Sequence, residues 1–138
     1  MVVADKLGAP NCKRLGAPHF SKGAGVMDIV TLLFTLVVVH CLFDFALQTE
    51  AIAINKNPDA GTPLQAHVPW YYWMGSHALL HGGGVALVTG SVVLGMLETA
   101  AHFSIDWGKC KGYFTIHQDQ FLHFLCKVIW TGLILLAR

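Results

Sequence analysis

The chain has 138 residues, of which 54% are hydrophobic and only 12% are charged. Soluble proteins average about 25% charged residues, so the composition argues against an ordinary soluble domain and favours an integral membrane protein. The formal net charge of +1 gives no support for a nucleic-acid partner.

The chain begins with a polar segment, residues 1–26, which we interpret as a flexible tail. The first apolar segment follows at residues 28–48 and is long enough to cross a bilayer as a helix. A secretory signal is the rival interpretation, with Ile29–Val39 as its apolar region. The segment continues through polar residues without a convincing small-residue cleavage site, so we favour a retained helix.

The rest of the membrane domain, residues 27–138, is predicted to hold three more helices. Turn signals make residues 50–69 a loop. One helix over residues 70–109 would be about 60 Å long, twice the hydrocarbon thickness, so the chain must turn back, best at Thr89-Gly90-Ser91. The expected helices are 28–48, 70–88, 91–108 and 119–137. We therefore predict an all-α fold, an antiparallel four-helix membrane bundle; a very apolar soluble bundle is the alternative.

Ionisable side chains recur on every predicted helix. Because an ionisable side chain inside the membrane carries a free-energy penalty of about 2.5–3.5 kcal/mol, each indicates a functional role. They form pairs spaced i, i+4, which places both members of a pair on one helix face. The pairs are His40 and Asp44, His77 and His81, His102 and Asp106, and Asp119 and His123.

The pairs are expected to meet at one depth. They come late in the first helix, early in the second, late in the third and early in the fourth, which an up-and-down bundle brings to one level. Histidine and carboxylate are ligands of first-row metals, and their number suits two ions. We predict a divalent metal site, with zinc as the first choice and iron or manganese as alternatives. A metal-free proton or ion relay and plain interhelical hydrogen bonding are the competing interpretations.

The ordered motifs resemble an uncharacterised family of small integral membrane proteins of bacteria and their phages. The motifs are HxxxDFxLQ from His40, HxxxH from His77, HFxIDxxK from His102 and DQxxH from Asp119. The resemblance covers about residues 28–137. It implies a multi-helix membrane fold but no established activity.

Two functions follow from this pattern. The first is a metal-dependent hydrolase acting on a lipid or another amphiphile at the membrane interface, in which a metal would activate water and polarise the scissile group. Glu98 and Asp44 are then candidate catalytic carboxylates, and Lys109 and Lys56 would suit a phosphate. The alternative is a module that binds or transports metal ions or protons. We prefer a localised site to a transport pathway, because a pathway needs polar groups through the whole depth of the membrane. In the half nearest the termini, Glu98 is the deepest polar candidate and stands alone.

Basic residues predict the orientation. Cytoplasmic flanks of membrane helices are enriched in Lys and Arg. The side of the termini carries five such residues, and the opposite side carries three, namely Lys56, Lys109 and Lys111. We therefore expect a protein of the bacterial inner membrane with both termini in the cytoplasm and with membrane lipids as its surroundings.

Overall fold

The structure is a computed structural model that describes residues 26–137, and these residues are helical apart from turns and connections. The predicted tail, residues 1–26, lies outside this range except for its last residue. The elements are α1 (Val26–Cys41), a π-helical turn η1 (Leu42–Ala46), α2 (Glu50–Asn55), a 3-10 turn η2 (Pro63–Ala66), α3 (Trp70–Thr89), α4 (Val92–Cys110) and α5 (Ile116–Leu136). The all-α prediction is confirmed for the described residues.

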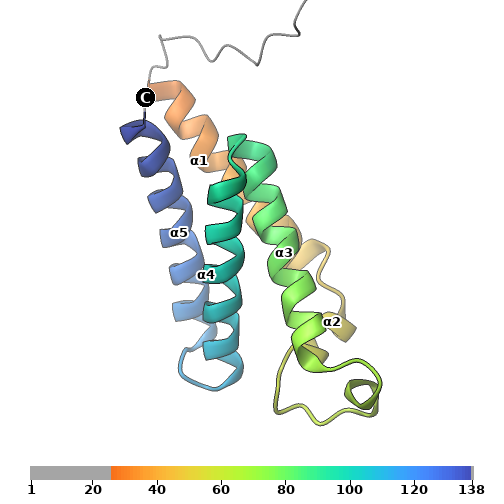
Figure 1. The fold of residues 1–138 in the computed structure, drawn as a ribbon. Helices are drawn as coiled ribbons and strands as arrows, with labels where there is room; N and C mark the ends of the chain where they lie inside the picture. The colour runs from red at the N-terminus through yellow and green to blue at the C-terminus, as the bar shows by residue number, and fades with distance from the viewer. Residues whose placement is uncertain (1–25, 138) are drawn as a thin grey trace, which may run out of the picture.

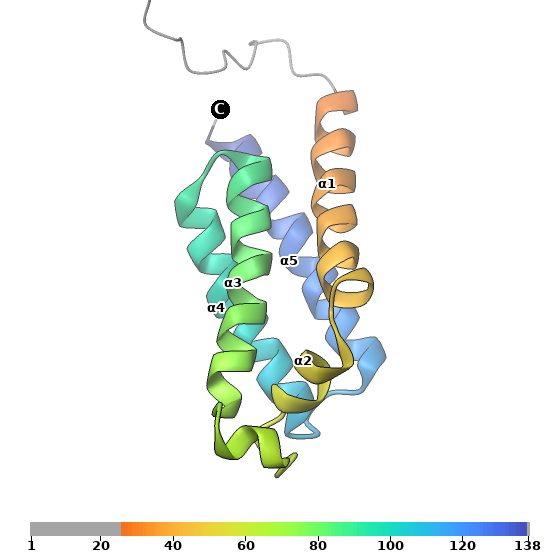
Figure 2. The same cartoon turned by 90° about the vertical axis from the view of Figure 1, so that its right-hand side faces the viewer.

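The long helices lie side by side (Figures 1 and 2). Helix α1 packs against α3 and α5, and α4 packs against the same two helices. The start of α1, the α3–α4 turn and the end of α5 lie at one end of the molecule, here called the terminal end (Figure 1). The two longer connections lie at the opposite end, here called the loop end.

Helices α3 and α4 form the most extensive contact, and glycines make it possible. The predicted turn is confirmed: Gly90 ends α3 in the left-handed conformation (φ 70°), and the Ser91 side chain caps α4. A Cβ atom on Gly82 would collide with the carbonyl oxygen of Gly95 across the helix pair. A Cβ atom on Gly84 would lie 2.5 Å from a Val39 methyl carbon of α1. Two of the three consecutive glycines therefore serve close helix packing.

The prediction of a plain loop over residues 50–69 was wrong, because part of it is the short helix α2. The Thr49 side chain caps this helix by accepting a hydrogen bond from the Ile52 amide. Asn55, at its end, is buried and accepts a 2.5 Å hydrogen bond from the Thr62 hydroxyl. The Gln65 amide donates to two backbone carbonyls of the same connection. Side-chain hydrogen bonds thus order a segment that its turn residues led us to treat as irregular.

Helix α5 begins three residues earlier than predicted. Thr115 and Gln118 form a capping box, in which each side chain bonds the other residue's backbone amide. The Thr-x-x-Gln spacing is the sequence signal for this helix start.

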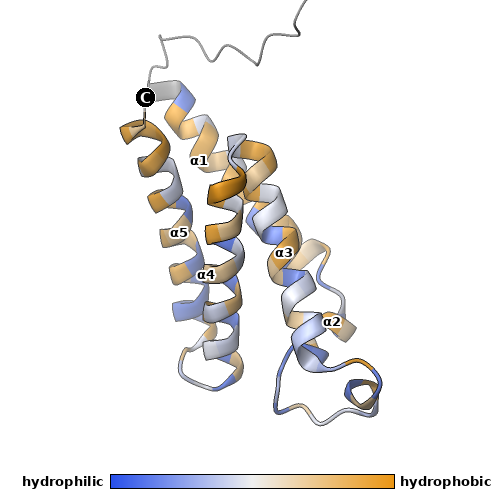
Figure 3. Cartoon of the chain, in the orientation of Figure 1, coloured by the Kyte–Doolittle hydropathy of each residue, from blue (hydrophilic) through white to orange (hydrophobic). Residues whose placement is uncertain are grey.

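Apolar and polar residues separate along the long axis of the bundle. Leu36, Val85, Leu94 and Trp130 form a buried apolar cluster. The more hydrophilic residues gather toward the loop end and on inner helix faces (Figure 3). By length and composition, two helical segments are apolar enough to cross a membrane, Asp28–Ala46 and Ile116–Leu136. The polar cluster described next is thus enclosed on the terminal side by apolar packing.

Candidate metal centre

Asp44 is positioned by the change from α-helix to π-helix at the end of α1. The Leu47 amide donates to the Leu42 carbonyl at 2.8 Å, which is the i to i−5 bond of a π-turn. The Gln48 side chain then donates to the Asp44 carbonyl at 2.7 Å. The wider turn rotates Asp44 relative to its place in an α-helix and leaves its carboxylate inside the bundle, 5% exposed.

The structure brings all eight predicted ligand side chains into one buried cluster. Their exposed fractions lie between 0% and 5%, and they are His40, Asp44, His77, His81, His102, Asp106, Asp119 and His123. The His102 ring stacks on the His81 ring at a centroid distance of 3.6 Å and on the His123 ring at 4.1 Å. Side chains from η1, α1, α3, α4 and α5 thus converge at one level.

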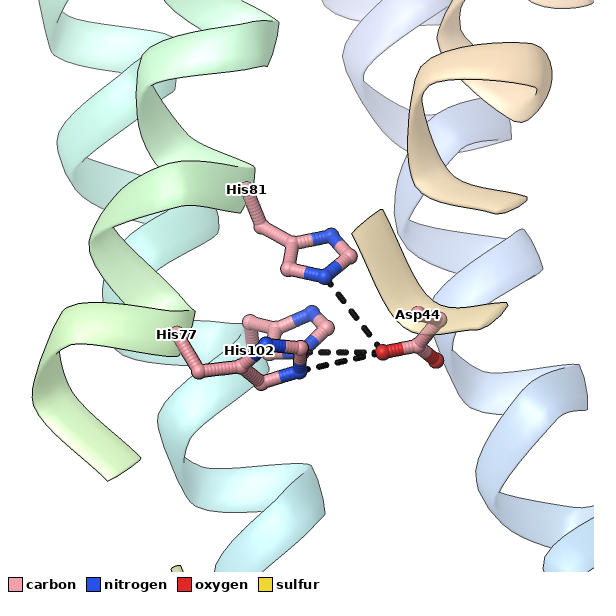
Figure 4. Close-up of side chains that lie close together, drawn as sticks. All are labelled: Asp44, His77, His81 and His102. Carbon is pink, nitrogen blue, oxygen red and sulfur yellow. Dashed lines mark hydrogen bonds and ion pairs between the residues drawn. The ribbon is translucent and has the colours of Figure 1, made fainter. Parts of the chain in front are cut away.

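One oxygen of Asp44 lies at distances from three imidazole nitrogens that are close to those between neighbouring ligands of a tetrahedral metal ion. Asp44 Oδ1 lies 3.1 Å from His77 Nε2, 3.3 Å from His81 Nε2 and 3.7 Å from His102 Nε2 (Figure 4). Zinc is bound at about 2.0–2.1 Å by such atoms, so neighbouring ligand atoms around one ion lie about 3.3 Å apart. Asp44, His77, His81 and His102 could therefore hold a metal ion with little movement.

A second group lies on the α5 side of the cluster. His123 Nε2 is 3.6 Å from Asp119 Oδ1 and 3.9 Å from Asp106 Oδ1. None of these three atoms has a hydrogen-bond partner among the described residues, although all are buried. Asp44 also joins Asp119 and His123 in a group with metal-binding separations. Asp44 therefore belongs to both groups.

Further ring nitrogens of the cluster are buried and lack hydrogen bonds within the described part of the chain. They are His40 Nδ1, His81 Nε2, both nitrogens of His102, and His123 Nδ1. Leaving a buried polar atom unpaired has a free-energy penalty of about 1–3 kcal/mol, so an arrangement with this many is unfavourable by itself. Ligation of a metal ion would satisfy several of them together.

Two lysines border the cluster at the loop end. Lys56, delivered by the end of α2, is 2% exposed and forms an ion pair with Asp106 Oδ2. Lys109 Nζ lies 3.7 Å from Asp119 Oδ2 and 3.8 Å from Asp106 Oδ1, and its side chain is 28% exposed. Lys109 is thus at the edge of the cluster, and Lys56 is inside it.

Glu98 does not stand alone, which corrects the sequence interpretation. Its Oε1 accepts a 2.5 Å hydrogen bond from Lys127 Nζ, and its Oε2 accepts a 2.6 Å hydrogen bond from the Trp130 indole. Its Oε1 also lies 3.7 Å from His102 Nδ1. Both carboxylate oxygens are therefore engaged on the terminal side of the imidazole cluster. Glu98 therefore lies next to the Nδ1 atom of His102, on the side of the ring away from Asp44.

Sequence reasoning missed Lys127, and Gln120 also contributes hydrogen bonds to the site. Lys127 follows His123 by four residues on an apolar helix, a spacing that continues the polar face and could have revealed it. The Gln120 side chain donates to Asp44 Oδ2 at 2.8 Å and to Asp119 Oδ2 at 3.1 Å. Its carbonyl oxygen lies 3.2 Å from His40 Nε2. Gln120 thus links three of the predicted ligands.

No protein-family model, curated protein or solved structure matches this chain. The chemistry must therefore be inferred from the cluster itself.

Proposed function

We propose that the protein is an integral membrane protein whose helices α1, α3, α4 and α5 form an antiparallel bundle around two divalent metal ions, with zinc the expected metal. The resemblance to small bacterial and phage membrane proteins is part of this proposal. We further propose that the bound metal serves hydrolysis of a lipid or another amphiphile at the membrane interface.

The outer surface of the bundle supports membrane insertion. Large apolar side chains are widely exposed on it, including Phe34 at 67%, Leu87 at 87% and Val92 at 71%. Extensive apolar exposure of this kind is unfavourable in water but suits contact with lipid chains. Tyr71 and Tyr72 at the start of α3 are 50% and 62% exposed, as expected for residues at a membrane interface.

The geometry around Asp44 carries the metal proposal. One carboxylate oxygen faces three imidazole nitrogens at 3.1–3.7 Å in a buried space. The other oxygen, Oδ2, lies 3.5 Å from His40 Nε2. A bridging Asp44 would connect one ion held with His77, His81 and His102 to a second ion. Asp106, Asp119 and His123 are the ligands that we propose for the second ion.

Hydrolysis is the reaction that this centre supports best. Two divalent ions held by these residues would activate water and stabilise charge on the leaving oxygen. The water oxygen would bond to the acyl or phosphoryl group as the ester bond breaks, and the proton lost by the water would pass to the leaving oxygen. An apolar pocket of about 430 Å³ on α4 and the connection that follows it suits a lipid chain; Phe103, Ser104, Trp107, Gly108, Tyr113 and Phe114 line it.

Transport or storage of a metal ion is the alternative, and one observation favours it. The Glu98–Lys127 pair extends the buried polar region beyond the imidazoles toward the terminal end. The apolar cluster of Leu36, Val85 and Leu94 argues against a continuous pathway, because an ion path needs polar groups through the whole depth. We therefore favour a closed site.

Elemental analysis of detergent-purified protein tests the metal proposal. We expect about two zinc ions per chain, since Asp44 belongs to two overlapping groups of possible ligands. Asp44→Asn and His81→Ala should lose most of the metal, whereas His117→Ala should not, because His117 is exposed on the same helix as His123. Equal metal content in all four proteins would refute the site.

Catalysis requires a separate measurement. The metal-loaded protein is incubated with defined phospholipids and lipid esters, and products are followed by mass spectrometry against chelator-treated protein. Metal-dependent product formation would support the hydrolase, and full metal loading without any product would favour the alternative.

A further inference from the structure

Three lysines surround the cluster, and each neutralises a different carboxylate. Lys56 pairs with Asp106, Lys127 pairs with Glu98, and Lys109 lies nearest Asp119. Among the four buried carboxylates of the region, Asp44 is the one without a lysine partner in the described structure. Lys56 and Lys109 therefore supply cations beside the ligands proposed for the second ion, and Lys127 supplies one beside Glu98.

Metal binding would give the buried region an excess of positive charge. With neutral imidazoles, four carboxylates and three ammonium groups leave one net negative charge in the buried region. Two divalent ions would change this to three positive charges. Burial of uncompensated charge is strongly unfavourable, by several kcal/mol for each ion even after relaxation. The metal-loaded site therefore favours an anion that carries more than one negative charge.

The geometry also indicates where the anion would lie. Asp106 Oδ1, Asp119 Oδ1 and His123 Nε2 are the buried unpaired atoms proposed to hold the second ion. Lys109 Nζ is 3.8 Å from that Asp106 oxygen, and its side chain is partly exposed. An anion entering at the loop end would therefore meet Lys109 and the second ion together. Lys56 is fixed against Asp106 from the inside.

We propose that the metal-loaded centre binds a phosphate group at its loop-end edge, between Lys109 and the second metal position. A phosphate monoester carries close to two negative charges near neutral pH, and its oxygens can contact an ammonium group and a metal ion together. This inference rests on the proposed metal site, and it narrows the substrate to a phosphate-bearing molecule. The phosphate can belong to a lipid headgroup or to a soluble compound.

Equilibrium dialysis with radiolabelled inorganic phosphate tests the proposal. The full chain in a phosphate-free maltoside detergent is measured with zinc bound and after chelation. We expect binding to the zinc-loaded protein alone. Lys109→Gln should weaken it at least about tenfold, since it removes a charge-assisted contact of about 1.5–3 kcal/mol. Lys111→Gln is the matched control: Lys111 lies two residues away and pairs with the exposed Asp59.

Zinc content is determined on the same samples, so the two proposals can fail separately. A protein that holds zinc but takes up no phosphate would overturn the phosphate site and leave the metal site intact. A protein without zinc would overturn both. If Lys109→Gln keeps its zinc and binds phosphate as tightly as the Lys111→Gln variant, the assigned position is wrong.

A second arm identifies the source of the phosphate. The zinc-loaded protein in phosphatidylcholine nanodiscs is compared with the same protein in nanodiscs that contain phosphatidic acid, whose headgroup is a phosphate monoester. Reduced phosphate uptake with phosphatidic acid supports a lipid headgroup as the ligand. Equal uptake in both supports a soluble phosphate compound.

Discussion

Replacement of Lys127 by methionine tests the buried ion pair on the terminal side of the cluster. Lys127 is 1% exposed and Glu98 is 0% exposed, and their charged atoms lie 2.5 Å apart. Lys127→Met keeps a flexible side chain, one heavy atom shorter, and removes the charge, so among the described residues Glu98 retains the hydrogen bond from the Trp130 indole and loses the one from Lys127. Breaking such a pair from one side destabilises a protein by about 3–5 kcal/mol. We expect the lower half of that range, because the indole hydrogen bond remains.

The free energy of unfolding is measured by titration of the detergent-solubilised protein with sodium dodecyl sulfate. The double variant Glu98→Gln/Lys127→Met removes both charges and should recover most of the loss, since no unpaired charge remains. Lys111→Met is the control, because its partner Asp59 is largely exposed and such surface pairs contribute about 0–1 kcal/mol.

Either of two results would refute this reasoning. If Lys127→Met is no less stable than Lys111→Met, the Lys127 ammonium must reach water by extending its side chain, and Glu98 is not paired as described. A double variant that is as unstable as Lys127→Met would refute the assignment differently, by showing that the methionine itself does not fit.

Three further predictions follow from the packing and the cluster. Gly82→Ala should destabilise the protein by about 1–3 kcal/mol, because its methyl group collides with the Gly95 carbonyl, whereas Gly83→Ala faces open space and should be neutral or stabilising; unfolding titrations measure both. Zinc should raise the midpoint temperature of thermal unfolding in detergent. At a free zinc concentration one hundred times the dissociation constant, the folded state gains about 2.7 kcal/mol of stability. An unchanged midpoint would argue against binding to the folded state. A cysteine at Asp59→Cys, in a variant without native cysteines, should react with an impermeant thiol reagent in intact cells; reaction only after lysis would place the loop end in the cytoplasm.

Local sequence patterns predicted the all-α fold and the grouping of the His and Asp pairs, because both depend on helix geometry. An i, i+4 spacing places His77 and His81 on one face of any α-helix that contains both. The turn at Gly90 could be predicted because it needs a residue that accepts positive φ. Even the convergence of the pairs at one level follows from helix lengths and short connections.

Tertiary structure decided which atoms face each other, and sequence spacing could not supply this. At the π-turn, Asp44 Oδ1 lies near His77 and Asp44 Oδ2 lies near His40. The turn is defined by the hydrogen bond from the Leu47 amide to the Leu42 carbonyl, which the residue types alone did not predict. Lys56 enters the cluster only because α2 folds back and is held by Asn55 and its partners.

The same distinction applies to Lys127. Its place on the polar face of α5 could be predicted from spacing, but its pairing with Glu98 depends on the rotation of α4 relative to α5. That rotation is set by side-chain packing between the helices, which acts between residues far apart in the chain. Local sequence spacing thus predicted which ionisable residues share a helix face, whereas the packing of the helices determined which charged groups pair with each other.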